Sequence, residues 1–150
     1  MGKLLNIVMK DASRAPLQMK DTATISIEAG VVGDFRGTVK NRQVTVVARE
    51  AWEHACKDLG TDIDWTARRA NLLIEGLYLN ETTGQQLHIG DAAILEITGE
   101  TTPCPRMDEA YQGLRAALGP DWRAGANCIV IKGGQISVGD TVKMEASVAV

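Results

Sequence analysis

The chain has 150 residues, 45% of them hydrophobic and 23% charged, which is typical of a globular protein with a buried core. Its formal net charge of −3 argues against a nucleic-acid partner, because general nucleic-acid-binding proteins are usually basic. No apolar run approaches the ~20 residues that span a bilayer, and the N-terminus lacks a signal-peptide layout, so we expect a single domain over residues 1–150 without a membrane segment.

The N-terminal third of the chain is predicted to form β-strands. Residues 4–9 are a short apolar run, residues 23–28 alternate with period two, and residues 43–48 are rich in β-branched side chains. A glycine-bounded loop over residues 31–37 is expected between the second and third strands.

A helix is predicted next, over residues 50–59. Its apolar stripe consists of residues at helical spacing, namely Trp52, Ala55, Cys56 and Leu59. Gly60 is a suitable stop, because glycine adopts the left-handed conformation that ends many helices. This arrangement places Cys56 on the buried face.

A strand–turn–strand pattern occurs twice in the chain. Residues 87–96 and 136–145 each read as a short apolar strand, a Gly-Asp turn and a second apolar strand. Because Gly-Asp allows tight turns at low steric cost, we interpret both copies as architectural, supplying strands to one barrel-like sheet. Asp91 and Asp140 are then turn residues before they are catalytic carboxylates. His88 lies between two apolar residues and is expected to face solvent or a groove.

The C-terminal third is predicted to contain a helix and a strand. Residues 108–118 carry an apolar stripe, with Asp108 as a candidate N-cap and Gly119 as part of the stop. Residues 126–131 read as a strand whose Cys128 is expected in the core.

Cys104 lies in the sequence Thr-Thr-Pro-Cys-Pro-Arg, residues 101–106. Pro105 lacks an N–H and biases Cys104 towards extended backbone angles, while Pro103 fixes its own φ. The two prolines predict a stiff joint that can hold the sulfur outside the packed core. Arg106 would favour the thiolate, the form that attacks and binds metals. A cysteine that fills a gap beneath a loop is the alternative from these residues alone.

The remaining cysteine pattern also points to Cys104. The chain has three cysteines, no Cys-x-x-Cys and no Cys/His cluster with zinc spacing, which argues against a disulfide framework and favours the cytoplasm. No Ser-His-Asp order, Walker A loop or dinucleotide fingerprint is recognisable. Cys104 is therefore the strongest candidate for a nucleophile or a soft metal ligand.

Several arginines lie in glycine- and proline-rich joints and could bind an anion. They are Arg36, Arg42, Arg69, Arg106 and Arg123. Arginine binds phosphate or carboxylate through two parallel hydrogen bonds, although each of these residues could equally be a solvated surface charge. Asn71 could add an amide contact to the ligand or make only a local backbone bond.

Five segments in chain order carry a family resemblance: Gly33-Asp34 with Arg42-Gln43-Val44, Arg69-Ala70-Asn71-Leu72 with Gly76-Leu77, residues 87–92, Thr102-Pro103-Cys104, and Arg123-Ala124-Gly125 with residues 134–140. Together they resemble the MOSC domain, which is named for the C-terminal part of molybdenum cofactor sulfurase. The resemblance implies a mainly β fold, a β-barrel-like domain with a few packed helices.

The resemblance also implies a function for Cys104. The corresponding cysteine of the family is thought to carry sulfur or to bind molybdenum held by the pterin dithiolene, and thiolate chemistry suits both roles. The pterin phosphate of the molybdenum cofactor (molybdopterin) would suit Arg69 and the neighbouring arginines, and Asn71 could bond the pterin. Many relatives have histidine after the early Gly-Asp, whereas this chain has Phe35-Arg36, so a histidine role is not carried over.

The sequence is compatible with three functions. Cys104 could bind molybdenum, or carry sulfur to it, in a protein that reduces N-hydroxylated compounds with electrons from a partner reductase. It could instead carry a persulfide without metal, with a cysteine desulfurase as sulfur donor. The chain could also be a non-enzymatic module that binds a ligand or a protein. No lysine marks a Schiff-base site, so pyridoxal phosphate is not expected on this chain.

Overall fold

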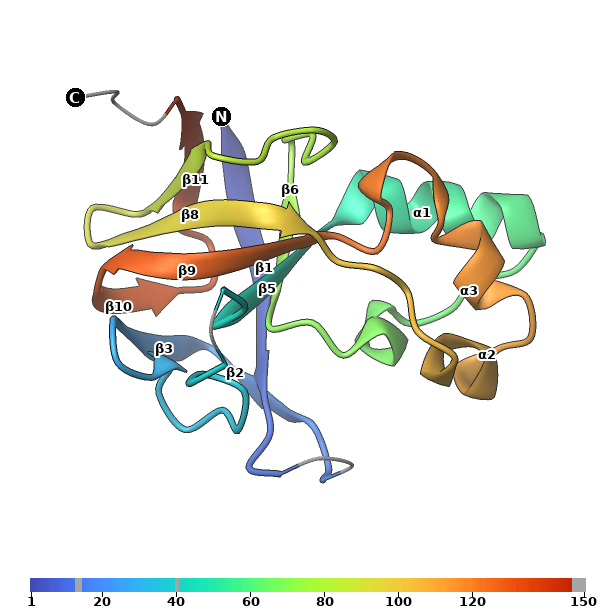
Figure 1. The fold of residues 1–150 in the computed structure, drawn as a ribbon, viewed down its shortest axis with the longest axis horizontal. Helices are drawn as coiled ribbons and strands as arrows, with labels where there is room; N and C mark the ends of the chain where they lie inside the picture. Colours follow the sequence, from blue (N-terminus) through green and yellow to red (C-terminus); the bar gives the residue numbers. More distant parts are fainter. Residues whose placement is uncertain (13–14, 40, 147–150) are drawn as a thin grey trace.

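The computed structural model describes residues 1–12, 15–39 and 41–146, and its main sheet closes into a barrel (Figure 1). In these residues an eight-stranded sheet runs in the order β11-β7-β8-β9-β5-β6-β1-β2, and β11 also pairs with β1 to close the ring. Neighbouring strands are antiparallel except for β5 and β6, which are parallel. The strands of the main sheet are Gly2–Met9 (β1), Gln18–Lys20 (β2), Val44–Ala48 (β5), Leu72–Glu75 (β6), Gln86–Ile89 (β7), Ala93–Glu100 (β8), Ala126–Lys132 (β9) and Thr141–Glu145 (β11).

A second, three-stranded sheet in the described residues consists of Gly134–Ser137 (β10), Thr22–Ser26 (β3) and Gly30–Val31 (β4). This sheet corrects the interpretation of the repeat. The first copy forms the hairpin β7–β8, but the second is divided, because β10 pairs with β3 while β11 pairs with β7 and β1. The Gly139-Asp140 turn bonds to Leu4 of β1 through Gly139 N–H and Asp140 O, so the chain leaves one sheet and enters the other at this turn.

The helices lie together at one end of the barrel (Figure 1). They are Arg49–Leu59 (α1), Arg106–Ala110 (α2) and Leu114–Ala117 (α3), with 3-10 turns at Trp65–Arg68 (η1) and Pro120–Trp122 (η2), as found in the described residues. A second hydrophobic cluster packs these helices against the barrel and includes Trp52, Trp65 and Met107 together with Val8 and Val47 from the strands. Each residue of β5 is consequently buried, as expected for a strand covered on both faces.

The helix predicted over residues 50–59 is confirmed as α1, whose last residue, Leu59, is followed by the capping residue Gly60. Gly60 has a φ of 72°, and its N–H reaches the carbonyl oxygens of Cys56 and Lys57. Trp52 and Cys56 are buried, and Trp52 Nε1 donates to Ile63 O at 2.7 Å.

The helix predicted over residues 108–118 is wrong in its continuity, because the structure has two short helices, α2 and α3. Gly113 between them has a φ of 93°, which interrupts a right-handed helix. Asp108 does not cap its own helix. Its Oδ1 accepts the backbone N–H groups of Gly113 and Arg115, both at 3.1 Å, and so orders the start of α3.

None of the helices in the described part of the chain is long and apolar enough to cross a membrane. The strands predicted at residues 4–9, 23–28, 43–48 and 126–131 correspond to β1, β3, β5 and β9, with differences at their boundaries. The expected mainly β, barrel-like architecture with packed helices is confirmed.

Candidate functional site

Cys104 lies in the connection between β8 and α2 and is exposed, whereas Cys56 and Cys128 are buried. The connection is anchored to the barrel at Thr101, whose N–H donates to Gly125 O and whose Oγ1 lies 2.8 Å from Asn127 Oδ1. After Cys104 the chain turns into α2, and Met107 N–H donates to Cys104 O at 3.0 Å.

Burial raises the pKa of the Cys128 thiol well above its ordinary value, which keeps that thiol protonated.

A cavity of about 370 Å³ opens beside Cys104. Segments far apart in the chain form its wall: the end of β1, the loop between β4 and β5, the end of η1, and the connection that carries Cys104. Its polar and charged lining residues are Lys10, Arg36, Arg42, Thr45, Arg68, Arg69, Thr101, Thr102, Cys104 and Arg106. Positive side chains therefore dominate this lining.

Asp34, an acidic residue next to this lining, accepts hydrogen bonds from backbone N–H groups. The buried Asp34 accepts the N–H of Lys10 at 3.0 Å and that of Arg36 at 3.2 Å. Its Oδ2 lies 3.9 Å from Arg36 Nε. Asp34 thus fixes the loop that carries Arg36 against the end of β1.

Four guanidinium groups of the cavity each have a buried nitrogen without a hydrogen-bond partner in the described structure. The atoms are Arg36 Nε, Arg68 Nη2, Arg69 Nη1 and Arg106 Nη2. Other nitrogens of these groups are held: Arg36 Nη2 donates to Arg69 O and Arg68 Nε donates to Ala124 O, both at 2.6 Å. Buried donors that lack partners are rare in proteins, and several around one cavity indicate an anionic ligand.

The electrostatics of the cavity support the same interpretation. Burial lowers the pKa of Lys10 to about 8, and the nearby Arg36, Arg69 and Arg106 lower it further, with a small opposing effect from Asp34. Burial also lowers the pKa of Arg68, to about 10, assisted by Arg36 and opposed by Cys104. The pKa of Arg36 is lowered mainly by burial. An anion in this cavity would relieve the repulsion among these groups.

Phe35 contributes an aromatic surface to the same cluster. Lys10 Nζ lies 5.1 Å from the centre of its ring, and Arg36 Cζ lies 5.2 Å from it. Cations over an aromatic face are attracted by the ring quadrupole, so Phe35 helps to hold both side chains in place.

The structure brings together most of the predicted site residues but not Asn71 or Arg123. Asn71 is buried between strands: its Oδ1 accepts Thr45 N–H at 3.0 Å and its Nδ2 donates to Val8 O at 3.2 Å. Arg123 binds Asp58 and Ala117 O beside the helices. Neither residue lines the Cys104 cavity.

Sequence reasoning missed Lys10 and Arg68, which line the cavity and are only 1% and 6% exposed. Arg68 adjoins the Arg69 that was predicted, so the Arg-Arg pair was an available signal. Lys10 follows an apolar strand without any local motif, and only the tertiary fold brings it to the arginines.

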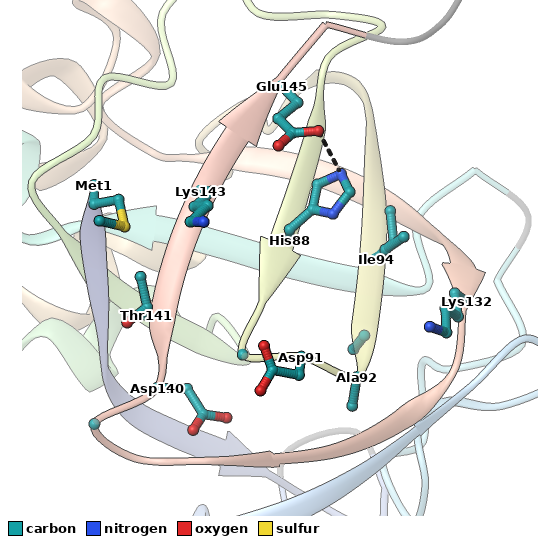
Figure 2. Close-up of a pocket in the computed structure, with 13 residues that line it drawn as sticks. Met1, His88, Asp91, Ala92, Ile94, Lys132, Asp140, Thr141, Lys143 and Glu145 are labelled. Carbon is teal, nitrogen blue, oxygen red and sulfur yellow. Dashed lines mark ion pairs between the residues drawn. The ribbon is translucent and has the colours of Figure 1, made fainter.

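A larger hollow, of about 630 Å³, lies on the other side of the barrel from the helices, where β7, β8 and β11 meet (Figure 2). Its charged groups have both signs, with His88 Nε2 lying 3.5 Å from Glu145 Oε2 and Asp140 Oδ2 accepting Ser137 N–H at 2.8 Å. His88 thus faces a groove, as expected, and Asp140 serves as a turn residue. This hollow contains no cysteine, and we assign the candidate site to the Cys104 cavity.

No cluster of three or more His, Cys, Asp or Glu side chains that could hold a metal ion occurs within residues 1–12, 15–39 and 41–146.

Three solved structures of bacterial proteins have the same fold. The chain superposes on the YuaD protein from Bacillus subtilis with a TM-score of 0.82 and 19% identity, covering 99% of this chain and 98% of that one. YiiM from Escherichia coli gives a TM-score of 0.73 and 17% identity over 99% of this chain and 72% of that one. YiiM from Geobacillus stearothermophilus gives a TM-score of 0.71 and 15% identity over 96% of this chain and 75% of that one. At these identities the likeness shows the fold.

No curated protein sequence matches the chain significantly. The family model of the MOSC domain, by contrast, matches residues 26–143, which include the loop of Arg36, the end of η1 and the connection that carries Cys104. MOSC domains are linked to molybdenum cofactor binding or to sulfur-carrier roles. On this match the chain belongs to the MOSC domain family.

Proposed function

We propose that the protein binds the molybdenum cofactor in the Cys104 cavity, with Cys104 Sγ as the protein ligand to the metal. The observation that carries the proposal is the exposed thiol of Cys104 beside four guanidinium groups whose buried nitrogens lack partners. A soft thiolate suits molybdenum, and guanidinium groups suit the phosphate of the pterin. The family's link to this cofactor supports the same ligand.

The residues of the cavity divide the binding task. Arg36, Arg68, Arg69 and Arg106 would donate hydrogen bonds to the anionic part of the cofactor, and Lys10 would add a charge at the end of β1. Arg42, which is exposed at the rim, would attract the anion before it enters. When bound, the cofactor supplies a redox-active metal centre. We propose that the protein, with the cofactor held by Cys104 and the arginines of the cavity, would reduce N-hydroxylated compounds with electrons from a partner reductase in the cytoplasm.

Metal analysis of purified protein tests the proposal. The protein is expressed in a host that makes molybdenum cofactor, and molybdenum and pterin are measured for wild type, Cys104→Ser and Arg68→Met. We expect both in wild type, loss of most molybdenum in Cys104→Ser, and loss of pterin in Arg68→Met. Arg115→Met is the matched control, because Arg115 is exposed on α3 and outside the cavity. Absence of molybdenum and pterin from wild type would contradict the proposal.

A second candidate function is sulfur transfer without metal, which the exposure of Cys104 favours because a donor protein can reach it. The Cys104 thiolate would attack the outer sulfur of a donor persulfide, forming a new S–S bond as the donor thiolate leaves. Mass spectrometry after incubation with a cysteine desulfurase and cysteine should then find one added sulfur on Cys104. Sulfur on Cys56 or Cys128 instead would contradict this function, and absence of both metal and sulfur would leave a binding module.

A further inference from the structure

A separate cavity of about 340 Å³ lies where the first half of α1, the loop after β6 and the end of η2 meet. Cavities of this size accommodate small molecules. Leu77, Leu79 and Trp122 are among its apolar lining residues, and Tyr78 at its wall is 85% exposed. The Cys104 cavity shares no lining residue with it.

Arg123 gives this cavity a buried positive group with an unused donor. The residue is 7% exposed and lines the cavity. Its Nη1 donates to Asp58 Oδ2 at 2.7 Å and to Ala117 O at 2.9 Å, whereas its Nε has no hydrogen-bond partner in the described structure. Such a donor calls for an acceptor, and a carboxylate is the acceptor that guanidinium groups bind best.

Glu50 gives the same cavity a negative group with an unused acceptor. Its Oε2 accepts the N–H of Gly76 at 2.8 Å, but its Oε1 is buried and has no donor among the described residues. A protonated amine would supply that donor. The cavity thus combines one orphan donor and one orphan acceptor with apolar side chains, and His54, Asn80 and the exposed Asp121 also line it.

The backbone that carries this wall is strained. Asp121 and Trp122 have φ values of 53° and 56°, in the left-handed region that bulky side chains rarely adopt. Trp122 packs against the barrel core and lines the cavity at the same time. Strain of this kind persists where the surrounding structure fixes it and is frequent at binding sites.

From these groups we propose that the cavity binds a small zwitterion with an apolar side chain, that is, an apolar α-amino acid. The ammonium group pairs with Glu50, the carboxylate with Arg123, and the side chain packs against Leu77, Leu79 and Trp122. The proposal is independent of the molybdenum cofactor and of Cys104.

Calorimetric titration with L-phenylalanine and two truncated analogues tests the proposal. 2-Phenylethylamine lacks the carboxylate and 3-phenylpropionate lacks the ammonium group. Since charge-assisted hydrogen bonds are the strong ones, we expect each analogue to bind about tenfold more weakly than phenylalanine. Equal affinity for all three, or no saturable binding of phenylalanine to folded wild type, would overturn the proposal.

Two conservative variants assign the groups. Glu50→Gln keeps the acceptor for Gly76 but removes the charge, so it should weaken phenylalanine and 2-phenylethylamine and leave 3-phenylpropionate unchanged. Arg123→Lys keeps a cation for Asp58 but removes Nε, so it should weaken phenylalanine and 3-phenylpropionate alone. His88→Gln, in the hollow of Figure 2, is the matched control and should bind like wild type. If Arg123→Lys does not fold, the Glu50→Gln titrations decide, and an equal effect of Glu50→Gln on all three probes would contradict the assignment.

Discussion

Lys10 and Arg68 show how individual residues make the Cys104 cavity electropositive. Both side chains are almost fully buried, yet no carboxylate pairs directly with either in the described residues. Burial lowers the pKa values of both groups, and the neighbouring Arg36 lowers them further. Burying a charge without a partner costs stability, so these two buried cations lower the free energy of unfolding of the protein.

The pH dependence of stability follows from Lys10. Its pKa is lowered from 10.5 to about 8 in the folded protein, so the unfolded chain binds more protons than the folded one between these values. The free energy of unfolding of the wild-type protein should therefore rise with pH across this window, relative to Lys10→Met, and the full cost of the buried charge should be present below pH 8. Urea unfolding midpoints of both proteins measure the effect, and a difference that does not change with pH would refute it.

The element that positions Cys104 is the connection from β8 into α2 and α3. Thr101 fastens its first part to β9, and Met107 packs its last part into the cluster beneath the helices. Because α2 and α3 are short, their stability depends on packing and on capping rather than on helix length. The Asp108 carboxylate, which orders the start of α3, therefore supports the position of the thiol indirectly.

Removal of this cap tests that dependence. Asp108→Ala should lower the free energy of unfolding by about 1 kcal/mol, the usual cost of losing a capping side chain. Asp108→Asn retains an acceptor oxygen and should lose less. Urea unfolding gives the values, and hydrogen exchange of α3 amides should rise in Asp108→Ala. Identical stability and exchange in all three proteins would show that the cap is not needed.

For the whole molecule, hydrophobic periodicity predicted the strands and α1, because those patterns follow directly from which faces are buried. The barrel-like fold was expected from the strand–turn–strand repeat and from the resemblance to the MOSC domain. The division of the second repeat between two sheets was not predictable, since it depends on the bonds of the Gly139-Asp140 turn to Leu4. The break between α2 and α3 at Gly113 was not predicted, because the apolar stripe of the sequence continues across this glycine.

Some residues of the candidate site could be predicted from local sequence, whereas others depend on the tertiary fold. The prolines around Cys104 and the arginines in joints are local signals, and they identified Cys104, Arg36, Arg42, Arg69 and Arg106, all of which line one cavity. Lys10 entered the site only through the fold. Asn71 and Arg123 were predicted to be in the site but lie outside it, because they bond to partners on distant segments.

The proposed function requires that Cys104 hold the metal of a cofactor bound by the surrounding arginines. X-ray diffraction at the molybdenum absorption edge, from crystals of protein produced in a cofactor-making host, tests it most directly. We expect an anomalous peak within bonding distance of Cys104 Sγ, with pterin density extending towards Arg68. A molybdenum peak elsewhere on the protein, or cofactor density without contact to Cys104, would contradict it.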